Sequence, residues 1–161
     1  MRANRLLGAS LVEHNLVSID DLDVANERLL ELISNSASSQ QISLLSILAS
    51  EKQKLDENKL FEHLIEEESL GIIDVRNIEI PEELRSVFNT GECWATWTVP
   101  FDLVEDTRYL ATAYYLSPVV RQYWEDKVQG KVVWFAASLE SITDFLEKYE
   151  AELANKAMTA N

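Results

Sequence analysis

The stretch LGASLVEHNLVSIDDL, residues 7–22, contains two helical segments and the turn between them. Apolar residues recur at helical spacing up to Asn15, a residue type that, like glycine, adopts the left-handed conformation that ends many helices. Ser18 then has the character of an N-cap, with Asp21 three residues later as the partner in a partial capping box. The stretch therefore predicts a helix-turn-helix unit within residues 5–33.

A second unit of the same kind is predicted after a polar loop at residues 34–41. Shifting the sequence by 38 residues aligns three apolar positions and the N-cap: Leu7 with Leu45, Val17 with Leu55, Leu22 with Leu60, and Ser18 with Asp56. Leucines often coincide in helical sequence, so an internal repeat and a chance alignment are equal alternatives at this point. Residues 1–69 are predicted to form a helical lobe with two degenerate motif copies.

From residue 70 onward, short runs rich in β-branched and aromatic residues replace the helical period. They predict strands at residues 71–75, 94–101, 108–115 and 131–136, with a hairpin connection at 102–107. Helices are predicted from Pro81 through Phe88, from Ser117-Pro118 to Gly130, and from the N-cap Ser138 to about Leu153. Residues 70–153 should form a small mixed sheet packed with helices, followed by a flexible tail at 154–161. The fold class predicted for the whole chain is α+β.

Acidic residues outnumber basic ones, with 28 Asp and Glu against 14 Lys and Arg and a formal net charge of −14. Because phosphates attract basic faces, this balance argues against nucleic acid or an anionic membrane surface as a partner. No signal peptide opens the chain, and the longest apolar-leaning run, residues 42–49, is too short to cross a bilayer. We expect a cytoplasmic protein without direct membrane insertion.

The residues that usually build catalytic and metal sites are scarce. The single cysteine, Cys93, excludes an internal disulfide and a cysteine-built zinc site. The two histidines, His14 and His63, belong to no recognisable signature, and we expect them to be exposed or hydrogen-bonded. The four glycines lie too far apart to form a phosphate-binding loop. We therefore predict no catalytic residue, no metal site, no cofactor and no enzymatic activity.

Two features of the sequence leave alternatives open. The acidic run Glu66–Glu68, at the end of a predicted helix, is either ordinary solvated surface, which we favour, or a patch for a basic partner. The four tryptophans either belong to the core, which we favour, or line a ligand face: Trp94, Trp97, Trp124 and Trp134.

The first motif resembles the repeated motif in the N-terminal domains of type II secretion and type IV pilus assembly ATPases, the GspE and PilB group. The positions that carry the resemblance are Leu7-Gly8, Leu11-Val12, Leu16, Leu22 and Ala25. Further marks are a strand that ends in Val99-Pro100-Phe101, the strand at 109–113, and Ser117-Pro118 at the start of a helix. The resemblance covers residues 5–150. A similar module ends some NfrB-type membrane glycosyltransferases.

The resemblance implies a regulatory or docking part that is separate from any motor or transferase. We therefore expect a non-enzymatic module that binds another protein of a secretion, pilus or envelope-polysaccharide glycosyltransferase assembly. Such a partner would hold the chain at the inner face of the membrane.

The alternative implied by the same resemblance is a sensor of cyclic di-GMP, since the MshE-type version binds this nucleotide on two tandem motif copies. Carried over to this chain, that site would use Arg5, Leu7, Gly8, Leu11, Leu45 and Ser46. The family's arginine position is occupied by Leu6 in the first copy and by Leu44 in the second. Because charge-assisted contacts to phosphate are the strong ones, this departure weakens the nucleotide alternative.

Overall fold

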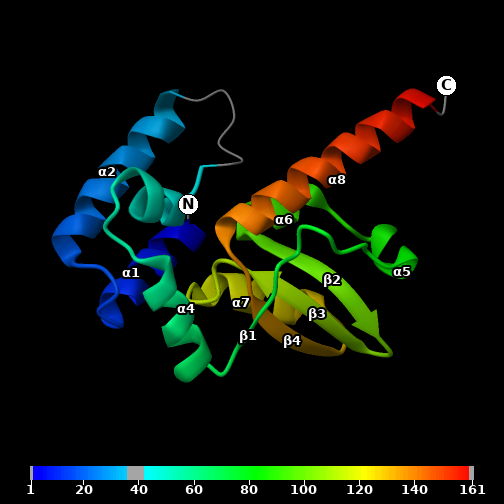
Figure 1. Ribbon diagram of the computed structural model, residues 1–161, viewed down its shortest axis with the longest axis horizontal. Helices are drawn as coiled ribbons and strands as arrows, with labels where there is room; N and C mark the ends of the chain where they lie inside the picture. The colour runs from blue at the N-terminus through cyan, green and yellow to red at the C-terminus, as the bar shows by residue number, and fades with distance from the viewer. Residues whose placement is uncertain (1, 36–41, 160–161) are drawn as a thin grey trace. The chain divides into compact units, whose positions relative to one another are not determined.

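The computed structural model describes residues 2–35 and 42–159, which form two compact units (Figure 1). Unit 1 contains the chain up to Gly71 together with Tyr114–Lys127. Unit 2 contains Ile72–Ala113 and the chain from Val128 onward. The sequence assigned residues 114–127 to the second lobe, whereas their contacts place them with the N-terminal helices. Within the described residues, no helix has the length and apolar composition needed to span a bilayer.

Unit 1 is helical. Its elements are α1 (Arg2–Glu13), α2 (Ile19–Asn35), α3 (Leu44–Ser46), the π-helical turn η1 (Ile47–Glu51), α4 (Glu57–Glu66) and α7 (Pro118–Lys127). The N-caps lie where the sequence predicts them: Ser18 Oγ accepts a hydrogen bond from the Asp21 amide at 3.1 Å, and Asp56 Oδ1 from the Asn58 amide at 2.9 Å. The predicted loop begins later than expected, because α2 continues through Asn35, and residues 36–41 lie outside the described residues.

The two helix-turn-helix units share the geometry of their turns. Asn15 and Gln53, 38 residues apart, are both left-handed, with φ of 58° and 52°. Before the turn, equivalent residues of the two copies are 37 rather than 38 positions apart. The hydrogen bonds that close the turns show this, because the Leu16 amide bonds to the carbonyl of Leu11 whereas the Lys54 amide bonds to the carbonyl of Leu48. The π-helical turn holds the additional residue. Leu11 and Leu48, both fully buried, are therefore equivalent at an offset of 37.

Unit 2 is a mixed sheet with helices, which confirms the α+β fold class. The strands are β1 (Gly71–Ile72), β2 (Thr98–Val104), β3 (Thr107–Thr112) and β4 (Lys131–Ala136), in the order β1-β4-β3-β2. β2 and β3 form the predicted antiparallel hairpin, and β3 pairs in parallel with β4. The helices are α5 (Glu82–Arg85), α6 (Thr90–Thr96) and α8 (Leu139–Thr159); α5 and α6 contact β2, and α6 contacts α8 (Figure 1).

The strand predicted at residues 94–101 is wrong in its first half, where α6 is found. The Asn89 side chain accepts a hydrogen bond from the Glu92 amide at 3.2 Å and so caps this helix. The helix ends at Trp97, which is left-handed with a φ of 48°. Trp94 packs edge-on against Trp97 and donates from Nε1 to Glu150 Oε1 at 2.6 Å. Capping and tertiary burial thus override the strand propensity of these aromatic residues.

Other boundaries in unit 2 also differ from the prediction. The first strand and the helix after Pro81 are shorter than predicted, at two and four residues. Ser138 caps α8 as predicted, its Oγ accepting from the Ser141 amide at 3.1 Å. Residues 154–159 of the predicted tail continue α8, and residues 160–161 lie outside the described residues. Of the four tryptophans, Trp94, Trp97 and Trp124 are buried, as expected of core residues, whereas Trp134 is half-buried.

A buried tyrosine joins three segments of unit 1 that are far apart in sequence. The hydroxyl of Tyr114 donates to Asn4 Oδ1 at 2.6 Å and forms a second hydrogen bond, of 2.5 Å, with Ser43 Oγ. Asn4 Oδ1 also accepts from the Leu44 amide at 3.2 Å. Burial raises the pKa of Tyr114 well above its usual value, so the hydroxyl stays protonated. The start of α1, the start of α3 and the segment before α7 are therefore fixed together.

Tyr114→Phe should lower the free energy of unfolding by about 1–3 kcal/mol, because Ser43 and Asn4 lose a partner in a buried site. Urea denaturation measures the change. The matched control is Tyr123→Phe, on a ring that is 41% exposed, which should change the value much less because water replaces the lost contact. Equal effects of the two variants would contradict a special role for the Tyr114 hydroxyl.

Candidate functional site

Most of the residues that the nucleotide alternative requires lie in the interior of unit 1. Leu7, Leu11 and Leu45 are at most 2% exposed. Arg5 is exposed and Ser46 is half-buried. Four of the six positions therefore present little or no surface to a ligand: Leu7, Gly8, Leu11 and Leu45.

Gly8 has a packing role in this interior. A Cβ at this position would lie 2.8 Å from Leu22 Cδ1 and 3.2 Å from Leu44 Cδ2. Glycine therefore allows α1 to approach these two leucines closely. At the offset of 37 that holds before the turn, Gly8 is equivalent to Leu45 rather than to Ser46. The second copy thus has a leucine where the first has its close-approach glycine.

The exposed side of α2 combines apolar and acidic side chains. We call this the α2 outer surface: Ile19, Asp20, Asp23, Val24, Glu27, Leu30 and Glu31. Ile19, Val24 and Leu30 are 63%, 49% and 54% exposed. Arg28, the one cation in the α2 sequence, is neutralised by Glu31 at 3.1 Å and Glu51 at 2.5 Å. This surface is therefore suited to a partner that is basic and partly apolar.

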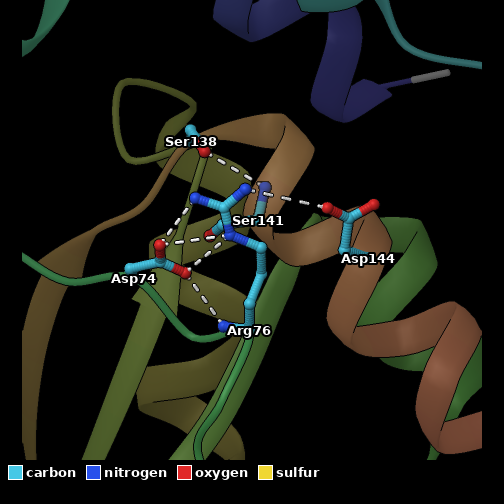
Figure 2. A network of polar contacts seen from close by, with 5 residues as sticks. All are labelled: Asp74, Arg76, Ser138, Ser141 and Asp144. Atoms are coloured by element: carbon cyan, nitrogen blue, oxygen red, sulfur yellow. Dashed lines mark hydrogen bonds and ion pairs between the residues drawn. The ribbon is translucent and has the colours of Figure 1, made fainter.

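A polar network in unit 2 connects the segment after β1 to α8 (Figure 2). Arg76 donates to both carboxylate oxygens of Asp74, from Nη2 at 2.7 Å and from Nε at 3.0 and 3.1 Å. Its Nη1 lies 3.9 Å from Asp144 Oδ2 on α8. The hydrogen bonds from the Arg76 side chain and amide lower the pKa of Asp74 from 3.8 to about 2. The carboxylate of Asp74 is thus an ion-pair partner and is not suited to act as a proton donor or acceptor near neutral pH.

A shallow pocket of about 170 Å³ lies beside this network. Its charged lining residues are Arg76, Glu79, Arg85, Lys148 and Glu152. Arg85 Nε donates a hydrogen bond to the Ile80 carbonyl at 3.0 Å. The pocket is smaller than the roughly 300–1,000 Å³ usual for small-molecule sites, and its lining contains no serine, cysteine or histidine. It is therefore small for a typical small-molecule site.

The structure brings the two histidines of the chain together in unit 1. The ring centroids of His14 and His63 lie 4.5 Å apart. His14 is exposed as expected, but the Nε2 atom of His63 is buried and has no hydrogen-bond partner, so the expectation of a satisfied histidine is wrong there. The two histidines are far apart in sequence and belong to different motif copies. No local spacing of residues could therefore have predicted that their rings lie together.

Sequence comparison finds no matching family model and no matching curated protein. Solved structures do match. The structure of MshE with cdg has a TM-score of 0.53 and 18% identity, covering 89% of this chain and 97% of that chain. The N-terminal domain of XpsE matches in two crystal forms, each with a TM-score of 0.55. In one, the identity is 16% with 90% and 94% of the two chains covered; in the other it is 17% with 86% and 90%.

The chain has the fold of the MshE and XpsE N-terminal domains. The agreement covers most of the length of each chain, so it includes both the helical unit and the mixed sheet. It confirms the GspE/MshE N-terminal-like fold that the motif at residues 7–25 implies.

Arg76→Gln should raise the pKa of Asp74 from about 2 towards 3.8, because the charge-assisted hydrogen bonds are lost. NMR titration of the Asp74 carboxyl carbon measures this value. The pKa of Asp74 is lower in the folded chain than its usual value. The ion pair with Arg76 therefore stabilises the folded state fully above pH 3.8, and this stabilisation is lost as the pH falls through about 2. The control is Arg85→Gln, which should leave the Asp74 titration unchanged; an unshifted Asp74 in Arg76→Gln would contradict the assignment.

Proposed function

We propose that this chain is a non-enzymatic docking module that binds another protein of a secretion, pilus or envelope-polysaccharide assembly. The observation that carries the proposal is the α2 outer surface, where three exposed apolar side chains lie among carboxylates. The shared fold with MshE and XpsE supports the same class of role, as does the sequence resemblance to the GspE and PilB N-terminal domains.

The interior of unit 1 supports a function that uses the surface. Leu7, Leu11 and Leu48 are packed inside, and a Cβ at Gly8 would lie within 3.3 Å of the methyl groups of Leu22 and Leu44. Binding through a preformed helix face does not require this core to open. A module of this kind would act by holding its partner in place.

The chemistry of the partner follows from the charge of α2. The helix carries five carboxylates and one guanidinium, in a chain with a net charge of −14. A complementary surface is basic and contains apolar side chains that cover Ile19 and Leu30. We place the partner among the cytoplasmic parts of the assembly, so that the chain would work at the inner face of the membrane.

Binding assays with purified assembly proteins test the docking proposal. The cytoplasmic domains of the secretion, pilus and glycosyltransferase proteins of the organism that encodes the chain are measured one by one by biolayer interferometry. One of them should bind, and the double variant Asp23→Lys/Glu27→Lys should weaken its Kd about tenfold or more, because like charges then face each other.

A charge-matched control separates the α2 outer surface from a general effect of net charge. Glu62→Lys/Glu66→Lys, at two exposed positions on α4, makes the same change in charge and should leave the Kd within about twofold. Equal weakening by both variants would contradict the assignment to α2. Failure of every assembly protein to bind would contradict the docking function itself.

A second candidate function is the sensing of cyclic di-GMP. The specific observation in its favour is that a solved structure with this fold is MshE with cdg. It would require ligand contacts from Leu7, Leu11 and Leu45, which are buried in this structure, and a phosphate contact from Arg5.

Calorimetry with cyclic di-GMP distinguishes the two functions. If the chain is a docking module, titration up to about 100 μM nucleotide gives no saturable heat, because the leucine interior is closed and Leu6 and Leu44 replace the family's arginines. Saturable binding that is lost in Arg5→Ala and kept in Arg2→Ala would establish the nucleotide site and replace the docking proposal.

A further inference from the structure

We propose that His14, His63 and Glu68 bind a divalent transition-metal ion of the zinc class. Each residue offers one ligand atom, two imidazole nitrogens and a carboxylate oxygen, and these atoms lie within 4.8 Å of one another. Nothing in the docking function requires such a site, so the inference stands or fails on its own.

The backbone holds all three residues at helix ends. His14 directly follows α1, where its amide bonds to the Ser10 carbonyl at 3.0 Å. His63 lies in the last turn of α4, and its carbonyl accepts from the Glu67 amide at 2.8 Å. Glu68 follows in a tight turn that the left-handed Ser69 completes. The C-terminal ends of α1 and α4 carry partial negative charge, which favours a bound cation.

The state of the His63 ring is the independent observation that points to a ligand. Its Nε2 atom is buried and has no hydrogen-bond partner in the structure. A buried polar atom without a partner is costly, and native proteins seldom retain one without a reason. A metal ion bound to this nitrogen would satisfy it, and the neighbouring ring of His14, 4.5 Å away between centroids, would supply the second nitrogen.

The set of donor atoms selects the class of metal. Imidazole nitrogen suits zinc, copper and nickel, whereas calcium and magnesium prefer sites made of oxygen atoms. Tetrahedral zinc, with bonds of about 2.0–2.1 Å, would bring the three ligand atoms to about 3.3 Å from one another. The exposed side chain of His14 can make most of this adjustment by rotation. Three protein ligands leave a fourth position for water or for a group on a partner.

The metal would link the two helix-turn-helix units of unit 1. His14 directly follows the first helix of the first copy, while His63 lies in the second helix of the second copy and Glu68 in the turn after it. An ion bound by both copies stabilises the folded state over the unfolded chain, which has no preformed site.

Isothermal titration calorimetry of the tag-free, chelator-treated chain with zinc chloride tests the proposal. The wild-type chain should bind one zinc ion at micromolar concentration, and His14→Ala and Glu68→Gln should each weaken the Kd at least tenfold. Zinc at about 100 times its Kd should raise the Tm by about 5 °C or more. Cobalt should give the intense visible absorption of a tetrahedral site.

The control is Glu67→Gln, which removes a neighbouring exposed carboxylate that the proposal does not use and should leave the Kd unchanged. Circular dichroism verifies that each variant is folded, and the exposed position of His14 makes that variant the safest. The absence of saturable binding at about 100 μM zinc would overturn the proposal. So would equal affinity in wild type, His14→Ala and Glu68→Gln, since binding would then reflect only the acidic surface.

Discussion

The buried hydroxyl of Tyr114 is the contact on which the arrangement of unit 1 depends. Its hydrogen bonds to Asn4 and Ser43 join residues that are 110 and 71 positions away in sequence. Ser117 adds a further connection, with Oγ donating to the Ala3 carbonyl at 2.9 Å. Short helices such as α3 are not stable alone. The tyrosine therefore fixes both motif copies against the segment that leads into α7, which explains why residues 114–127 belong to the helical unit.

The consequence for function is that the leucine-rich motifs serve mainly as a core. The same residues that carry the family resemblance, Leu7, Gly8 and Leu11, fill the interior and allow α1 to approach Leu22 and Leu44. Other molecules can then contact only the exposed faces of these helices. On α2 that face carries apolar side chains among carboxylates. The role that we propose for the chain thus follows from which face of each helix is buried.

Local signals in the sequence predicted more than long-range ones. The caps at Ser18, Asp56 and Ser138 follow from side chains that bond within three residues, and strand β4 from its β-branched run. Helix α6 was missed, because burial of Trp94 and the cap at Asn89 outweigh the strand propensity of its residues. The pairing of His14 with His63 depends on how two helices pack. No sequence pattern encodes that distance, so this candidate site required the structure.

Native-state hydrogen exchange of the chain alone tests the closed interior most directly. If the leucine motifs form a fixed core, the amides of Leu11 and Leu48 exchange only through global unfolding. Their exchange free energies then equal the free energy of unfolding measured with urea. Exchange of these amides through a local opening of much lower free energy, while the strands of unit 2 stay protected, would show that the motifs open readily. That result would contradict a module that acts only through its surface.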